Sequence, residues 1–242
     1  GLKVFIEPSG YTGVVPNNTK KGSNGLVINK EGQLVLCMVG DRRVSKLSDF
    51  FDKKFITITD NFKGNLFNSP NDLVYAENGD LFFTDPPGGL LKKDDDELKE
   101  LPFNGVFKLT KSGVLSLLIK NLTRPNGIGI SKDQKTLYVS NSDPNNPIIM
   151  SYEIVPDGVR KPKVFFDGKE LSKKYKGNFD GLKIHPGGAI FSTGPGGVLI
   201  ISKNGEHLGT INTNERTSNC NFDDNFNYLY MTTNRYLTRV KL

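Results

Sequence analysis

Short apolar runs alternate with turn residues along the whole 242-residue chain. In the stretch "SPNDLVYAENGDLFFTD", residues 69–85, two apolar runs flank an Asn-Gly turn. The same layout returns in "RPNGIGISKDQKTLYVS" (124–140) and in "NFDGLKIHPGGAIFSTG" (178–194). No window keeps a helical period, and 26 Gly and 13 Pro interrupt the apolar runs. The pattern predicts many short strands joined by turns rather than long helices.

Five segments also share a polar residue that precedes the first apolar strand, which we call the lead residue. The lead residues, at successive spacings of 47, 55, 54 and 39 residues, are Asn24, Asn71, Asn126, Asp180 and Asn219. This spacing is close to the ~40–50-residue period of a four-stranded propeller blade. A β-solenoid repeats at a shorter period, and a β-sandwich has no reason to repeat the polar residue. The prediction is therefore an all-β propeller that forms a single domain over residues 1–242.

The lead residues are the first candidates for chemistry, because the innermost strand of every propeller blade lines one central channel. Amide and carboxylate oxygens are hard ligands that suit Ca²⁺, Mg²⁺ or Mn²⁺, and the absence of Cys and His at these positions disfavours a zinc-type site. The alternative is that each Asn or Asp only forms a turn before its strand. Repetition in register favours a convergent polar site, since turn chemistry alone would also accept Ser, Gly or Thr.

Composition excludes several classes of partner. A hydrophobic content of 36% with 24% charged residues is that of an ordinary globular protein. The net charge is +6, but the Lys and Arg residues are scattered near turns and are not interleaved with aromatic residues, which argues against a nucleic-acid partner. No apolar run reaches the length of a membrane span.

The two cysteines and the first residues change the picture little. Cys37 and Cys220 each lie in an apolar strand context, which predicts two buried thiols rather than a disulfide framework. The chain opens with "GLKVFIEPSG", without a start Met or a signal peptide, so we expect a processed or incomplete N-terminus. Nothing in the sequence indicates a compartment or an oligomeric state.

Taken in order, four stretches resemble one known family over essentially the whole chain. They are "FIEPSGYTGV…NGLVINKEGQLVLCMVGDRRV", "SPNDLV…FFTDPPGGL", "RPNGIGIS…LYVSNS" and "NFDGLKIHPGGAIFSTGPGGVLI". The chain is similar to the gluconolactonase, regucalcin and luciferin-regenerating group. This resemblance implies a six-bladed β-propeller that hydrolyses a sugar lactone with a divalent cation at the channel mouth. Ca²⁺ is the first choice for the cation, with Mg²⁺, Mn²⁺ or Zn²⁺ as alternatives.

The resemblance also implies roles for individual residues. Asn126 and Asp180 match the family's metal ligands, and Asp180 is in addition the candidate catalytic acid or base. Asn71 matches a position that either ligates the metal or contacts the substrate. Asn24 and Asp85 fall where substrate-side polar groups sit. The cation would polarise the lactone carbonyl for attack by water, with Asp180 accepting the proton.

One departure from the family pattern concerns the first blade. The family carries a metal-ligating Glu in an "E-G-P-x-W" type motif upstream of "KVFIEP", and Glu7 does not match it. Either the chain begins after most of the first blade, or the metal site lacks one ligand. In the first case two arrangements are open. Either the ring has a gap with two exposed sheet edges, or the "KVFIEP" segment, read as a strand, pairs with the last blade, which lacks a fourth strand.

Two other functions stay open on the sequence. The same scaffold could hydrolyse phosphotriesters, because a fold does not fix its chemistry. It could also be a non-catalytic propeller that binds a metal and serves as a binding or scaffolding module. The irregular segment 85–105, "DPPGGLLKKDDDELKELPFNG", is read either as a lid over the substrate or as a solvated acidic loop.

Overall fold

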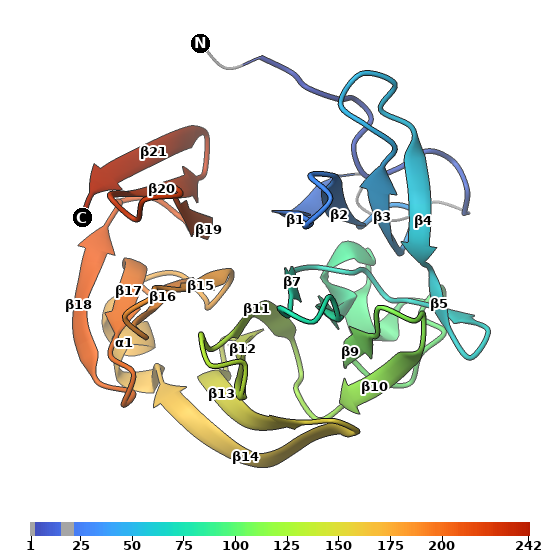
Figure 1. Ribbon diagram of the computed structural model, residues 1–242. Helices are drawn as coiled ribbons and strands as arrows, with labels where there is room; N and C mark the ends of the chain where they lie inside the picture. The colour runs from blue at the N-terminus through green and yellow to red at the C-terminus, as the bar shows by residue number, and fades with distance from the viewer. Residues whose placement is uncertain (1–2, 16–21) are drawn as a thin grey trace. The chain divides into compact units, whose positions relative to one another are not determined.

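A computed structural model describes residues 3–15 and 22–242. Within these ranges the protein is all-β with almost no helix, and it consists of five antiparallel sheets and one small hairpin. The chain divides into two compact units, Gly1–Arg124 and Pro125–Leu242, which are described in turn (Figure 1). The five sheets are the blades of a propeller-like arrangement, each formed by strands that pair in chain order.

Unit 1 contains two four-stranded blades. The first comprises β1 (Ser23–Ile28), β2 (Leu34–Met38), β3 (Arg43–Leu47) and β4 (Phe55–Thr59). The hairpin of β5 (Asn61–Phe62) and β6 (Asn65–Leu66) then leads to the second blade. That blade comprises β7 (Leu73–Tyr75), β8 (Leu81–Asp85), β9 (Gly105–Leu109) and β10 (Leu115–Ile119). Between β8 and β9 lie two short 3₁₀ helices, η1 (Pro87–Gly89) and η2 (Lys93–Asp95).

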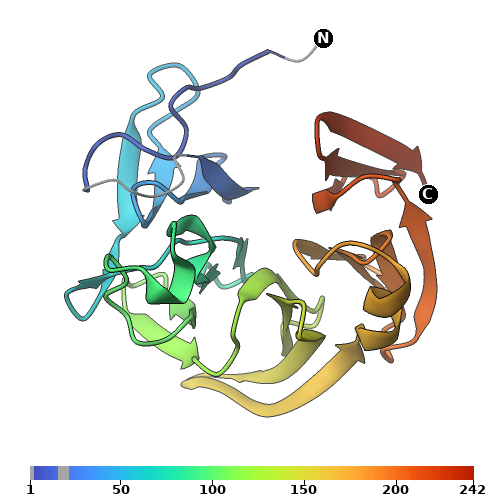
Figure 2. The ribbon, with the colours of Figure 1, turned by 180° about the vertical axis from the view of Figure 1, so that it is seen from behind.

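Unit 2 contains three blades, whose strands can also be followed from behind (Figure 2). Its first blade comprises β11 (Pro125–Ile130), β12 (Thr136–Asp143), β13 (Asn146–Val155) and β14 (Gly158–Asp167). The helix α1 (Lys169–Lys174) leads to β15 (Leu182–Ile184), β16 (Ile190–Gly194), β17 (Gly197–Ile201) and β18 (His207–Asn212). The last blade has the three strands β19 (Thr217–Phe222), β20 (Tyr228–Thr233) and β21 (Tyr236–Lys241).

The predicted strands and turns are confirmed. The first and second strands of each blade enclose the apolar runs identified in the sequence, and the turns between them fall at the expected polar residues. Gly79 illustrates the reason for one of these turns. It adopts φ 92° in the β7–β8 turn, a backbone conformation in which a residue with a side chain would be strained. At the equivalent place in the β11–β12 turn Gln134 adopts φ 61°.

Each unit has its own apolar core. In unit 1 the core is built around Phe67, Phe83 and Phe107, whose ring centroids lie 5.2–5.3 Å apart. In unit 2, Phe179 packs with the inward residues of β15–β17, and a second cluster surrounds Cys220 under the last blade. Alternate strand residues supply these cores, because successive side chains of a strand point to opposite faces.

The segment read as a strand at "KVFIEP" was predicted wrongly: residues 3–15 contain no strand. The segment is instead attached to the first blade by side chains. The Phe5 ring packs on that of Phe50, and the carboxylate of Asp41 accepts hydrogen bonds from the Thr12 backbone N–H (2.9 Å) and hydroxyl (2.7 Å). An apolar run forms a strand only where a partner edge accepts its backbone hydrogen bonds.

Two further expectations meet the structure here. Five blades are present in the described residues, with a three-stranded last blade as expected, and a sixth blade is not among them.

The segment 85–105 is neither a detached lid nor a fully solvated loop, since Leu90 and Leu101 are buried and Asp96 is 5% exposed. Among the described residues no helix is long and apolar enough to cross a membrane.

Candidate functional site

The three lead residues of unit 2 lie at the starts of neighbouring inner strands. Asn126 is in β11, Asp180 lies two residues before the first residue of β15, and Asn219 is in β19. Strand β15 contacts both β11 and β19. Backbone hydrogen bonds connect the blades at this level: Gly127 N donates to Asp180 O (3.1 Å), and Gly181 N donates to Ser218 O (2.9 Å). The lead residues of unit 2 thus lie on adjoining backbone segments, and the convergence of their side chains on one site stays a prediction.

The glycine that follows a lead residue makes this approach feasible. A Cβ on Gly127 would lie 2.3 Å from the carbonyl oxygen of Asp180, and a Cβ on Gly181 would lie 2.2 Å from the side chain of Asn219. These separations are below any real Cβ contact, so only glycine lets the inner strands come this close. The sequence pattern Asn/Asp-Gly thus encodes blade-to-blade contact as well as a turn.

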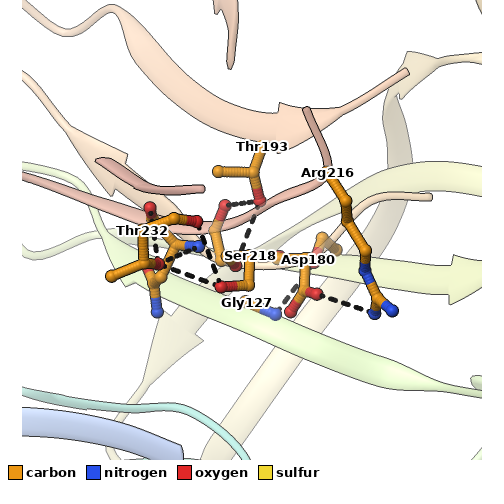
Figure 3. Close-up of polar contacts among 9 residues, drawn as sticks. Gly127, Asp180, Thr193, Arg216, Ser218 and Thr232 are labelled. Carbon is orange, nitrogen blue, oxygen red and sulfur yellow. Dashed lines mark hydrogen bonds and ion pairs between the residues drawn. The ribbon is translucent and has the colours of Figure 1, made fainter. Parts of the chain in front are cut away.

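Hydroxyl groups from the second strands hold the first strands in place (Figure 3). The Ser140 hydroxyl donates to Asp180 O (2.7 Å) and accepts from Gly127 N (2.8 Å). The Thr193 hydroxyl donates to Gly181 O (3.1 Å) and to Ser218 O (3.3 Å). These hydrogen bonds hold the backbone of Asp180 in place, so the point from which its carboxylate projects is fixed.

The carboxylate of Asp180 faces Arg216, which belongs to the loop between β18 and β19. The distance from Asp180 Oδ2 to Arg216 Nη2 is 3.7 Å, and the side chains are 17% and 80% exposed. Figure 3 shows the guanidinium of Arg216 reaching toward the carboxylate of Asp180. A mostly covered carboxylate beside an exposed guanidinium can accept a proton or bind a cation. Arg216 was not identified from the sequence, since no motif surrounds it.

The two amide lead residues of unit 2 differ in their surroundings. Asn126 is 8% exposed and so is nearly enclosed. Asn219 Oδ1 accepts the backbone N–H of Cys220 (2.9 Å) and the ammonium of Lys183 (3.3 Å). The first of these bonds is a local contact within β19 and not the turn that the sequence analysis set against a ligand role. Asn219 therefore has a structural task whatever else it does.

In unit 1 the equivalent relation links Asn24 and Asn71. Gly25 N donates to Asn71 O (2.7 Å), and a Cβ on Gly25 would lie 2.7 Å from that oxygen. Asn24 is exposed and Asn71 is half-buried, so both amides are accessible. Their substrate and ligand roles stay predictions.

Asp85, expected among the substrate-side groups, has no exposed surface. Its two carboxylate oxygens accept the backbone N–H groups of Asn68 (2.8 Å) and Ser69 (2.7 Å). Burial raises the pKa of Asp85 to about 7, against the lowering effect of these two donors and of the Arg42 charge. In this structure the carboxyl group organises the loop before β7, and its predicted substrate role stays a prediction.

A group of buried charges next to the first blade was missed by the sequence analysis. The Arg42 side chain is 2% exposed and donates from Nε to Phe67 O (2.6 Å). Arg43 pairs with Asp41 at 2.9 Å, and neither side chain is more than 9% exposed. The "DRRV" stretch entered the sequence analysis only as part of the family resemblance. Charged residues in a turn are usually exposed, so the sequence gives no sign that these are buried.

The donor set of unit 2 fits a hard divalent cation in its chemistry. It offers amide and carboxylate oxygens from adjacent inner strands, held close by Gly127 and Gly181, without a thiolate or imidazole among the lead residues. Within residues 3–15 and 22–242 no group of three or more His, Cys, Asp or Glu is placed to hold a metal. A site here would thus depend on amide oxygens as much as on carboxylates.

Comparison with known proteins agrees with the motifs. Residues 8–235 match the family model described as SMP-30/Gluconolactonase/LRE-like region. A gluconolactonase from Zymomonas mobilis is 35% identical over all of this chain, which spans 69% of that protein. The solved structure of a gluconolactonase from Xanthomonas campestris has a TM-score of 0.82 and 29% identity, over 91% of this chain and 72% of its own.

A more distant structure shares only the fold. Regucalcin from Agrobacterium tumefaciens, described as a calcium-binding protein, has a TM-score of 0.54 and 16% identity, over 90% of this chain and 84% of its own. The relatives named gluconolactonase place the chain with lactone-hydrolysing enzymes. Since the family model covers nearly the whole chain, this protein belongs to the SMP-30/gluconolactonase/LRE-like family.

Proposed function

We propose that this protein hydrolyses a sugar lactone and that Asp180 is its catalytic base. The observation that carries the proposal is the position of Asp180 at the start of β15, with its main chain fixed by Gly127 and Ser140 and its carboxylate 17% exposed. Family membership supports the reaction class, and the relatives named gluconolactonase support a gluconolactone-like substrate.

The reaction requires little beyond a placed base and a polarised carbonyl. Asp180 Oδ takes a proton from a water molecule as the water oxygen attacks the lactone carbonyl carbon. The ester C–O bond of the ring then breaks, and Asp180 returns the proton to the ring oxygen, which becomes a hydroxyl group. The product is the open-chain hydroxy acid. Fixed geometry of this kind lowers the barrier by holding the reacting groups in place.

A divalent cation is part of the proposal, with Ca²⁺ first and Mg²⁺, Mn²⁺ or Zn²⁺ as alternatives. Asn126 and Asp180 would hold it, and Asn71 is the proposed ligand or substrate contact from unit 1. When bound, such a cation supplies Lewis acidity toward a carbonyl oxygen. Asn24 and Asn71 would orient the sugar hydroxyl groups by hydrogen bonding.

The proposal is tested by replacing Asp180 with Asn and measuring hydrolysis of δ-gluconolactone by proton release. We expect kcat/KM to fall at least about 100-fold, as for loss of a general base, with little change in the unfolding midpoint. Asp157→Asn is the matched control, because Asp157 is an exposed carboxylate in the β13–β14 turn of the same unit. Unchanged turnover in Asp180→Asn would refute the assignment.

Chelation separates this function from its alternatives. Treatment with EDTA is expected to abolish turnover, and added Ca²⁺ to restore it. A non-catalytic metal-binding propeller would instead show a rise in thermal stability with Ca²⁺ and no turnover of any lactone. A phosphotriesterase would turn over a phosphotriester such as paraoxon faster than δ-gluconolactone.

A further inference from the structure

A pocket of about 490 Å³ opens in unit 2 beside Asp180, and we call it the Arg216 pocket. Its walls come from the segment between α1 and β15, the β16–β17 turn and the loop between β18 and β19. The side chains that matter for recognition are Tyr175, Lys176, Asn178, Asn212, Asn214 and Arg216. Its volume lies within the roughly 300–1,000 Å³ that is usual for small-molecule sites.

The pocket is connected to the candidate catalytic residue through Arg216. Arg216 both lines the pocket and approaches Asp180 Oδ2 at 3.7 Å. Asn178 lies two residues before Asp180, and the backbone N–H of Asp180 bonds to the carbonyl of Thr193, next to the pocket residue Gly194. A molecule that presents an ester to Asp180 would therefore extend its remainder into this pocket.

Hydrogen bonds connect the walls of the pocket. Gly196 N donates to Lys176 O (3.0 Å), which joins two of the three walls. The Asn212 side chain accepts the Asn214 N–H (2.8 Å) and so shapes the third wall. Asn234 N donates to Arg216 O (2.9 Å) and fixes the main chain from which the guanidinium projects. Because the walls are already ordered, binding a ligand here requires little further ordering of the protein.

The lining has the chemistry of a site for an anionic sugar derivative. Three Asn side chains offer both donors and acceptors, which suits hydroxyl groups, and Tyr175 offers an aromatic face that is half exposed. Of the charged lining residues two are cations, Lys176 and Arg216, and one is an anion, Glu215. The Glu215 carboxylate accepts the Asn234 side-chain N–H (3.0 Å) and keeps its negative charge, so the lining has one more positive than negative charge.

Arg216 can turn from Asp180 to a ligand at little cost. Its side chain is 80% exposed, and Arg216 Nη2 lies 3.7 Å from Asp180 Oδ2, too far for a hydrogen bond, so turning away breaks no hydrogen bond between these two atoms. A guanidinium bound to a carboxylate or phosphate makes short, charge-assisted and often bidentate hydrogen bonds, which are stronger. The ligand interaction is thus favoured over the pair with Asp180.

We infer that the protein prefers lactones that carry a second, anionic group, held in this pocket by Arg216 and Lys176. The inference rests on the proposed lactone hydrolysis, since it assigns the pocket to the far end of that substrate. The shared chemistry is an oxyanion on a polyhydroxylated chain, and a carboxylate and a phosphate are its two sources.

The test uses product acids, whose binding does not require turnover. Gluconate, glucarate and 6-phosphogluconate are titrated into the full chain by calorimetry, and kcat/KM is measured for the corresponding lactones. We expect at least one of the two acids that carry a second anionic group to bind about 10-fold or more tightly than gluconate, and its lactone to have the higher kcat/KM. The tighter of the two identifies the anionic group.

Variants connect that preference to the pocket. Arg216→Gln with Lys176→Gln is expected to remove the preference, whereas Lys203→Gln, which removes an exposed cation in the β17–β18 turn, leaves all values unchanged. Equal binding of the three acids, or a preference that survives the double substitution, overturns the inference. If δ-gluconolactone is hydrolysed but no preference exists, only the pocket assignment fails. If the preference exists without turnover of any lactone, only the hydrolase proposal fails.

Discussion

Gly127 donates its backbone N–H to the carbonyl oxygen of Asp180 at 3.1 Å, in a place where a Cβ on Gly127 would lie 2.3 Å from that same oxygen. The relation joins the innermost strand of one blade to the candidate base of the next. It makes the position of Asp180 depend on the absence of a side chain 53 residues away in the sequence. Blade packing and the site are therefore coupled through one contact.

Replacing Gly127 with Ala tests this coupling. The added methyl group would clash with backbone rather than with a flexible side chain, so the inner strands must separate. We expect the free energy of unfolding to fall by about 2 kcal/mol or more, which is in the range of overpacking in a core. We also expect lactone turnover to fall, because Asp180 moves with its carbonyl group. Urea unfolding and steady-state kinetics measure the two effects.

Gly209→Ala is the matched control for that experiment. Gly209 lies in β18 of the same unit, and nothing lies within 4 Å of a Cβ built on it. The control should match the wild type in activity and equal or exceed it in stability. Equal unfolding free energies for Gly127→Ala and Gly209→Ala would show that the contact is unimportant.

Much of the fold was predictable because strand pairing in a propeller is local. Each apolar run pairs with the next one along the chain, so the runs and the turns between them identify the blades without any long-range information. The segment at residues 3–15 shows the limit of this reasoning. Its apolar pattern is that of a strand, but its fate depends on whether an edge is available to it, which the local sequence does not encode.

The site was predictable only in part. The repeated lead residues pointed to Asn126 and Asp180 because a repeat places equivalent positions together. Arg216 could not be found, since it is a single Arg in an irregular loop and acts through spatial proximity alone. Burial of Asp85 was equally hidden, because "FTD" at a strand end has the same letters whether the carboxylate faces solvent or the backbone of another loop.

The ion pair of Asp41 and Arg43 predicts a large cost for one substitution. Asp41 is fully buried and bonds to Arg43 at 2.9 Å and to Thr12 through both oxygens. Asp41→Ala leaves the Arg43 charge without its partner in a buried place, so we expect a loss of about 3–5 kcal/mol in unfolding free energy. Limited proteolysis should then cleave residues 3–15 first, because Thr12 loses its acceptor.

Asp52→Ala provides the comparison for Asp41. Asp52 pairs with Lys54 at the same distance of 2.9 Å, but the side chains are 51% and 75% exposed. Solvent screens this pair, so we expect no measurable change in stability or in the cleavage pattern. A stability loss in Asp41→Ala no larger than that in Asp52→Ala would show that burial adds nothing to the first pair.

We expect both cysteine thiols to be unreactive in the native protein. Cys37 and Cys220 are both buried, as predicted, and they are not joined in a disulfide. Burial raises the pKa of the Cys37 thiol well above its usual value, and the nearby carboxylates of Asp72 and Asp85 raise it further. Because only the thiolate reacts, Ellman's reagent at pH 8 should label no thiol in native protein and two in denaturant. Rapid labelling without denaturant would contradict the packing of unit 1 or unit 2.

Asp85 predicts a dependence of stability on pH with a definite sign. Its pKa is raised from 3.8 to about 7 in the folded protein, mainly because burial disfavours the charged carboxylate. Between these two values the folded state holds a proton that the unfolded chain releases. Stability is therefore greatest below pH 4 as far as this group is concerned, and it falls by up to about 1.4 kcal/mol per pH unit as the pH rises toward 7.

The variant Asp85→Asn isolates this contribution, because an amide does not titrate. One backbone N–H, from Asn68 or Ser69, then faces an amide NH₂ instead of an oxygen, so we expect about 1–3 kcal/mol lower stability at acid pH. The difference in unfolding free energy between wild type and variant should shrink as the pH rises from 5 to 7.5 and then stay constant. Urea titrations at four pH values measure it. A difference that is constant over this range, or one that grows, would mean that the carboxylate is already ionised at pH 5 and that its two N–H donors outweigh its burial.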